Sequence, residues 1–185
     1  MKKMNFESCY QFLKYRSIKI QFVSSFSMEK KFEFNYQLLD SWKSLEEEER
    51  YLVSKAYEAM NRAYAPYSKF RVGTSVQLSD GTVILGNNQE NIAYPSGLCA
   101  ERVALFYAGA NFPNEAVETI VIVAKGDLMP DKQLLSPCGS CRQVMLETEN
   151  RQQKPMKVIL INQDDRTMVL ESVQHLLPFG FGTFD

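Results

Sequence analysis

Apolar residues recur at helical spacing between residues 36 and 64 of the chain. A first apolar group surrounds Trp42, and a second follows with the three- and four-residue spacing of an amphipathic helix. Ser44 followed by Glu47 is typical of a capping box at a helix start. Pro66 marks the end of the stretch, because proline disfavours helix in the residue before it. We therefore expect a helix pair, or one long helix, in this segment.

Downstream the pattern changes to strands that alternate with helices. Residues 70–78 alternate with period two, and Asp80-Gly81 is a hairpin-turn signal before a second short strand. Later apolar runs are of the type that forms buried strands. The expected strands are 70–78, 82–85, 119–124, 157–161 and 168–170. The expected helices are 99–110 and 138–149, with a short one at 171–177. This order predicts a layered α/β domain with a mixed sheet, and both cysteine-led helices on one face.

Composition and charge narrow the class of protein. The chain has 185 residues, of which 45% are apolar, and this excludes a mainly disordered chain. The sequence has no apolar run near the roughly 20 residues that a membrane span requires. The formal net charge is −1, so there is no strong electrostatic case for nucleic acid or anionic lipid as a partner. We expect a cytoplasmic protein that binds neither.

The amino-terminal segment differs from the rest of the chain. Residues 1–27 contain five Lys or Arg against the single acid Glu7, so the segment is basic and the remainder acidic. It lacks the continuous apolar core of a signal peptide, although an organellar transit peptide is an alternative. The simpler interpretation is a disordered extension, or translation that truly begins at Met28. We expect an extension over residues 1–35 and one domain over residues 36–185.

Four cysteines are present: Cys9, Cys99, Cys138 and Cys141. Without a secretion signal a disulfide framework is not expected. Cys9 lies in the extension, with no partner motif. Cys138 and Cys141 are an i, i+3 pair at the start of a predicted helix, so both sulfurs can reach one metal ion. Cys99 begins another helix, and two helix amino termini that converge would favour thiolates.

Three thiolates around zinc would leave one tetrahedral position for water, as in catalytic rather than structural sites. The alternative is a closed site with the sole histidine, His175, as fourth ligand, but its surroundings lack ligand-like spacing. Glu101, two residues after Cys99, could stand beside the open position as a proton shuttle, or could merely favour the helix amino terminus. Arg102 could offset the charge of the sulfurs, or could be a solvated surface arginine.

Two motifs carry a family resemblance. Cys99-Ala100-Glu101-Arg102, together with Pro137-Cys138-Gly139-Ser140-Cys141-Arg142-Gln143, resembles the cytidine deaminase family, in its small homotetrameric zinc type. The likeness extends over about Tyr51 to Gly182, including residues 65–73 and 86–91. It implies a three-layer α/β/α domain with a mixed sheet of about five strands. It also implies one Zn²⁺ per subunit and a homotetramer.

The resemblance further implies roles for individual residues. Asn88 and Glu90 would hydrogen-bond the ribose, although a polar turn is the alternative. Phe70 would stack on the pyrimidine, although it could be an ordinary core residue. Tyr94 and Phe181 would reach a neighbouring subunit's site, although the short tail could simply fray. The carbonyls of Ala100 and Ser136 would hold the substrate's amino group.

The implied activity is zinc-dependent hydrolytic deamination of free cytidine and deoxycytidine to uridine and deoxyuridine, in pyrimidine salvage. Glu101 would move protons in this reaction. Three alternatives stay open: deamination of another aminopyrimidine such as blasticidin S, deamination of cytosine within RNA, and a zinc-stabilised interaction protein without catalysis. The acidic body argues against RNA, since phosphate contacts need Lys and Arg.

Overall fold

The structure is a computed structural model that describes residues 29–128 and 133–182. The chain divides into two compact units, residues 1–33 and 34–185, and the elements below belong to the second. The basic amino-terminal charges and Cys9 lie outside the described residues, so the predictions about them stay predictions, as does the boundary at residue 35. No helix of the described residues is long and apolar enough to cross a lipid bilayer.

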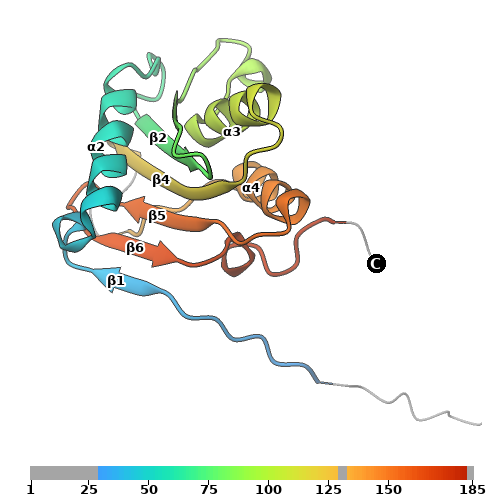
Figure 1. The fold of residues 1–185 in the computed structure, drawn as a ribbon. Helices are drawn as coiled ribbons and strands as arrows, with labels where there is room; N and C mark the ends of the chain where they lie inside the picture. The colour runs from blue at the N-terminus through green and yellow to red at the C-terminus, as the bar shows by residue number, and fades with distance from the viewer. Residues whose placement is uncertain (1–28, 129–132, 183–185) are drawn as a thin grey trace, which may run out of the picture. The chain divides into compact units, whose positions relative to one another are not determined.

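One mixed sheet of six strands forms the centre of this unit (Figure 1). Its spatial order is β1-β6-β5-β4-β2-β3. Only the β4–β5 pair is parallel, and the other neighbours are antiparallel. The strands are β1 Gln37–Leu39, β2 Arg71–Leu78, β3 Val83–Asn87, β4 Val117–Lys125, β5 Lys157–Ile161 and β6 Thr167–Leu170. The α/β class is confirmed, with six strands rather than about five.

Helices cover both faces of the sheet, which makes three layers (Figure 1). Helix α2, Glu47–Asn61, packs on one face over a core that includes Val121 and Ile159. Helices α3, Ala100–Asn111, and α4, Gly139–Gln152, pack on the other face. The two cysteine-led helices therefore share a face, as predicted. Short 3-10 helices span Trp42–Ser44, Tyr94–Ser96 and Val173–His175.

The segment before α2 is not the predicted first helix. Residues 37–39 instead form β1, which adds to the sheet edge with Gln37 opposite Val169 of β6. The capping box also lies elsewhere: Glu46 and Glu49 make its reciprocal contacts, not Ser44 and Glu47. Pairing with a strand about 130 residues away overrides the local helical spacing, which a sequence pattern does not reveal.

Two glycines let helices approach the sheet closely. A Cβ at Gly73 of β2 would overlap the carbonyl oxygen of Ala56 in α2. A Cβ at Gly86 of β3 would overlap the carbonyl oxygen of Ala100 and would lie 2.8 Å from the backbone nitrogen of Ala104 in α3. Because the first turn of α3 rests directly on the β3 backbone, Gly86 fixes the height of that turn above the sheet.

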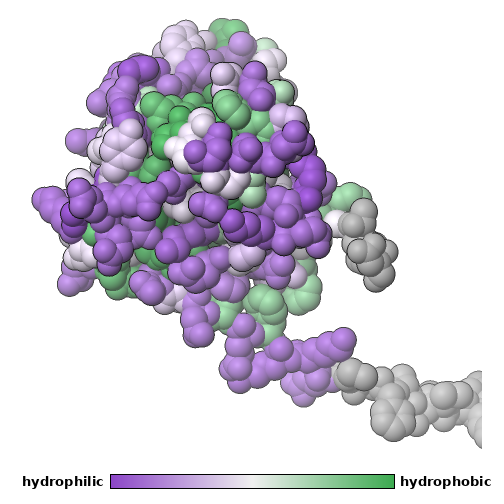
Figure 2. Space-filling view, in the orientation of Figure 1, coloured by the Kyte–Doolittle hydropathy of each residue, from purple (hydrophilic) through white to green (hydrophobic). Residues whose placement is uncertain are grey.

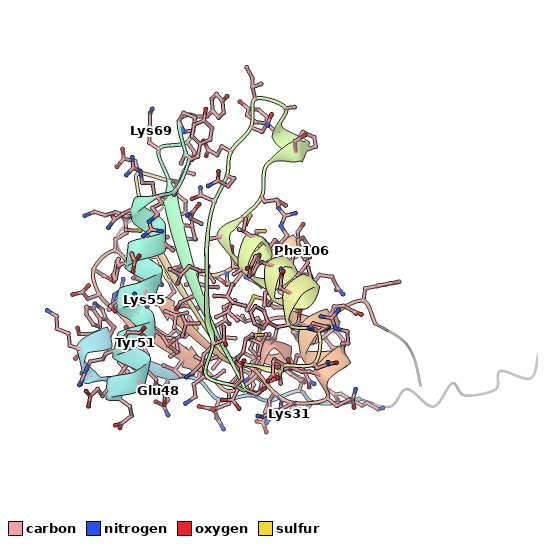
Figure 3. All side chains as sticks on the ribbon, turned by 45° about the horizontal axis from the view of Figure 1, so that its top comes forward. Lys31, Glu48, Tyr51, Lys55, Lys69 and Phe106 are labelled. Carbon is pink, nitrogen blue, oxygen red and sulfur yellow. The ribbon has the colours of Figure 1, made fainter. Side chains whose placement is uncertain are left out.

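Most of the visible surface is hydrophilic, with a hydrophobic area in the space between α2 and α3 (Figure 2). The outer faces of these helices are mixed in character. Tyr51 and Lys55 project from α2, where the Lys55 Nζ lies 5.7 Å from the centre of the Tyr51 ring, and Phe106 projects from α3 (Figure 3). Tyr51 and Phe106 are exposed, and the opposite faces of the two helices pack against the sheet.

Candidate metal centre and active site

Two helix amino termini bring the three cysteines together. Cys99 is the N-cap residue of α3, Cys138 is the N-cap residue of α4, and Cys141 lies in the first turn of α4. All three sulfurs lie within 4.8 Å of one another, and the Cys99 and Cys138 sulfurs are 3.9 Å apart. The unpaired backbone N–H groups of the two first turns place partial positive charge beside these sulfurs.

The geometry and chemistry of the group fit zinc. A tetrahedral ion with Zn–S bonds near 2.3 Å would separate its sulfur ligands by about 3.8 Å, and the Cys99–Cys138 separation matches this. Among the described residues, no histidine or carboxylate joins the three sulfurs as a fourth ligand. His175 instead stacks on Phe34, with ring centres 5.5 Å apart. The cofactor that this donor set holds is zinc, with one position left to water or substrate.

Proton sharing among the sulfurs already favours a thiolate at Cys99. Hydrogen bonding with Cys141 lowers the pKa of Cys99 to about 5, although burial opposes the shift. Arg102 adds to this effect, because its Nη2 lies 3.7 Å from the Cys99 sulfur. The same hydrogen bond with Cys99, together with burial, raises the pKa of Cys141. Arg102 thus lies beside the Cys99 sulfur, and its predicted role in offsetting the charge of the sulfurs stays a prediction.

Glu101 lies in the first turn of α3 and is buried, with only 4% of its surface exposed. Burial raises the pKa of its carboxyl to about 7. A hydrogen bond from its own backbone N–H opposes the rise, and charge on Cys99 adds to it. A carboxyl that is half protonated near neutral pH can both accept and release a proton, which is what general acid–base chemistry needs.

Arg142 holds the loop that leads into α4, a role that its position in the sequence did not reveal. Its Nε donates to the Pro137 carbonyl oxygen at 2.9 Å, and its Nη2 donates to the Ser136 hydroxyl at 2.7 Å. Its Nη1 donates to the Leu176 carbonyl oxygen at 3.1 Å. The guanidinium thereby fixes the approach of the chain to Cys138 and ties it to the carboxyl-terminal segment.

Asn162 is a second positioning residue that the sequence did not indicate. It is buried just after β5, where its Oδ1 accepts from the Leu135 backbone N–H at 2.6 Å. Its Nδ2 donates to the Gln133 carbonyl oxygen at 3.1 Å. These bonds fix the chain a few residues before Cys138. The partners are backbone atoms of a loop, so no spacing of residue types could have predicted them.

Asn88 and Glu90 join a network that holds residues 67–72. The Asn88 Oδ1 accepts from the Val72 N–H at 2.8 Å, and its Nδ2 donates to the Phe70 carbonyl oxygen at 2.9 Å. The Glu90 carboxylate accepts from the Ser68 hydroxyl and from the Tyr67 N–H, the latter at 2.9 Å. Their intramolecular role is thus to shape the loop before β2.

The other predicted substrate contacts lie in different surroundings. Phe70 is half-buried and packs against the core on the α3 side, and Ala100 is fully buried at the start of α3. Tyr94 is 76% exposed and meets Tyr67 edge-on at 6.3 Å, and Phe181 is 81% exposed. The Phe181 backbone is held by the side chain of Gln143 in α4. The predicted roles of all four stay predictions.

Comparison with known proteins places this geometry in a family. Residues 46–156 match the cytidine and deoxycytidylate deaminase zinc-binding region. The chain is 44% identical to a cytidine deaminase of Halalkalibacterium halodurans over 96 residues. This aligned stretch covers 52% of this chain and 68% of the relative. It is 31% identical over 141 residues to a probable cytidine deaminase of Dictyostelium discoideum, which covers 76% of this chain and 88% of that one.

A solved structure agrees with these matches. The crystal structure of cytidine deaminase from Burkholderia pseudomallei is similar with a TM-score of 0.61 and 36% identity, over 71% of this chain and 98% of that chain. Residues 46–156, which match the family model, contain the three clustered cysteines and Glu101. On the evidence of the sulfur cluster, the buried carboxyl beside it and these matches, the chain belongs to the cytidine deaminase family.

Proposed function

We propose that this chain removes the 4-amino group of free cytidine by hydrolysis, giving uridine and ammonia. The observation that carries the proposal is the position of Glu101, a buried carboxyl with a pKa of about 7, two residues from one of three clustered sulfurs. When bound at Cys99, Cys138 and Cys141, zinc supplies a Lewis acid that lowers the pKa of a water molecule. A metal centre and a poised acid–base group are what hydrolytic deamination requires.

Glu101 moves the protons in this proposal. Its carboxylate accepts a proton from the attacking water and passes it to N3 of the pyrimidine. The water oxygen, now bonded to C4, gives up its second proton to Glu101, which passes it to the 4-amino nitrogen. The bond between C4 and that nitrogen then breaks, ammonia leaves, and the oxygen remains as the C4 carbonyl of uridine. The Ala100 and Ser136 carbonyl oxygens accept hydrogen bonds from the amino group, and Arg102 offsets the negative charge of the sulfurs.

The proposed sugar contacts use the remaining hydrogen-bonding capacity of Asn88 and Glu90. Each Asn88 amide atom makes one backbone bond, so the Nδ2 keeps a second N–H and the Oδ1 keeps a second lone pair. The Glu90 Oε1 accepts from Ser68 and keeps a further acceptor site. Both side chains can therefore bind ribose hydroxyls while they hold the loop. Phe70, whose carbonyl oxygen accepts a hydrogen bond from Asn88, stacks on the pyrimidine.

The proposal extends to deoxycytidine, to a place in pyrimidine salvage, and to a cytoplasmic homotetramer in which Tyr94 and Phe181 reach a neighbouring site. Tyr94 and Phe181 are 76% and 81% exposed, so both side chains are available to reach a neighbouring subunit. Light scattering would measure the subunit count, and parallel assays with both nucleosides would measure the preference.

The decisive experiment measures cytidine turnover and zinc content in one purified sample of the full chain. Glu101→Gln is expected to keep zinc and the fold but to lose at least about 100-fold in kcat, because it removes the acid–base group. Glu147→Gln, at an exposed position of α4, is the matched control and should keep full activity. Normal turnover in Glu101→Gln, or no turnover of cytidine by the zinc-loaded chain, would overturn the proposal.

A further inference from the structure

Thr74, in the middle of β2, carries a buried hydroxyl without a hydrogen-bond partner. Its side chain is fully buried, and its Oγ1 is one of three buried side-chain nitrogen or oxygen atoms in the described residues that lack a partner. Two other buried hydroxyls are paired: Ser75 donates to the Leu52 carbonyl oxygen at 2.7 Å, and Thr148 to the Val144 carbonyl oxygen at 2.9 Å. An unpaired buried hydroxyl costs roughly 1–3 kcal/mol, so this one requires an explanation.

The register of the sheet places Thr74 beneath the first turn of α3. Its neighbours Gly73 and Ser75 face α2, so Thr74 faces the opposite side, where α3 packs. Thr74 pairs with Gly86 on β3, and Gly86 is the position where the α3 backbone touches the sheet at Ala100. The Thr74 side chain therefore points toward the turn that begins with Cys99.

Glu101 lies on that same turn and faces the sheet. It shares the buried stripe of α3 with Ala104 and Leu105, which are three and four residues further along. Glu101 is the only acidic residue of this turn. On the facing row of β2, Thr74 is the polar member between Val72 and Val76. A buried carboxyl and an unpaired buried hydroxyl thus lie on two surfaces that pack together.

Neither side chain is open to solvent. Thr74 is fully buried and Glu101 is 4% exposed, so bulk water does not supply a hydrogen-bond partner to either one. Buried polar groups find their partners within the protein, and these two lie on surfaces that pack together.

We propose that Thr74 is a positioning residue for Glu101. In the zinc-loaded enzyme the Thr74 hydroxyl hydrogen-bonds to the Glu101 carboxyl and holds that side chain toward the reacting atoms. A hydroxyl can rotate, so it donates to a carboxylate and accepts from a protonated carboxyl. It can therefore hold Glu101 in both protonation states of the reaction. This inference rests on the proposed proton transfer by Glu101.

The test compares Thr74→Val with Thr74→Ser in the zinc-loaded full chain. Valine keeps the shape without the hydroxyl, and we expect at least a tenfold lower kcat, a KM for cytidine within twofold of the original, and unchanged zinc content. Serine keeps the hydroxyl and should retain kcat within about threefold. The valine variant should also melt a few degrees lower, because the proposed bond stabilises the loaded form.

A Glu101→Ala background supplies a readout that does not depend on turnover. There the hydroxyl has lost its partner, so adding Thr74→Val should leave the melting temperature unchanged or raise it. Unchanged kcat in Thr74→Val, or the same fall in kcat for serine as for valine, would overturn the inference. These outcomes differ from failure of the proposed function, in which the original chain itself would not deaminate cytidine.

Discussion

The side-chain amide of Gln143 exchanges two hydrogen bonds with the backbone of Phe181. The Gln143 Nε2 donates to the Phe181 carbonyl oxygen at 2.7 Å, and the Phe181 N–H donates to the Gln143 Oε1 at 3.0 Å. Gln143 follows Cys141 by two residues on α4. The carboxyl-terminal segment is thus attached to the same helix that carries two of the metal ligands.

Gln143→Ala should release this segment. If Phe181 contributes to substrate binding, the KM for cytidine will rise several-fold while kcat and zinc content change little, because the metal centre itself is untouched. Steady-state kinetics and metal analysis provide the measurement. Glu147→Ala, one turn further along α4 and exposed, is the control. An unchanged KM in Gln143→Ala would argue against a role for the tail.

Arg142→Lys should weaken zinc binding. Lysine keeps the positive charge but cannot make the three separate contacts that fix the loop before Cys138. Loss of such outer contacts typically costs about 10- to 100-fold in metal affinity, and competition with a chelator would measure it. Arg151→Lys, near the end of α4, should bind zinc as the original chain does. Equal affinities in the two variants would show that the loop does not depend on Arg142.

Glu90→Gln should affect both substrate binding and stability. An amide NH₂ in place of one carboxylate oxygen would face donors at Ser68 and Tyr67, so the loop would lose part of its anchoring. We expect about 1 kcal/mol less stability and at least a tenfold higher KM for cytidine. Thermal unfolding and kinetics would test the two effects separately. A fall in stability with an unchanged KM would leave Glu90 a structural role only.

Gly86→Ala and Gly139→Ala form a matched pair. The added methyl group at Gly86 would overlap the Ala100 carbonyl oxygen, so α3 must shift with Cys99 and Glu101. We expect a loss of about 3 kcal/mol and of most activity. At Gly139 a Cβ meets nothing within 4 Å, and alanine favours helix. That variant should therefore be fully active and at least as stable, and a loss of zinc there would contradict the described geometry.

Much of the fold was predictable because its signals are local. Alternation identified β2, and cysteine spacing together with helical pattern identified the starts of α3 and α4. The error lay in residues 37–39, where an apolar group near Trp42 suggested a helix. These residues form β1 because β6, from the other end of the domain, offers an edge to pair with. The capping box was misplaced since the run Glu46–Glu49 allows several registers.

The metal ligands were also predictable from local sequence signals, but the residues that position the loop around them were not. Cys138 and Cys141 have a spacing that indicates metal binding by itself, and Cys99 adds the third sulfur from the start of a second helix. Arg142 and Asn162 act on backbone atoms of a loop, which depend on the folded path of the chain. Thr74 looks like any strand residue in the sequence. Its significance appears only once its hydroxyl is seen to lack a partner.

The network of Asn88 and Glu90 has a consequence for laboratory evolution. Because these side chains brace the loop before β2, any library that varies them to admit an altered sugar also varies folding. Each member of such a library would lose part of the loop's hydrogen bonding, so a change in its stability would accompany any change in its selectivity. A search for new specificity is best begun from a thermally reinforced parent, or with second-site changes at Ser68 that restore the brace.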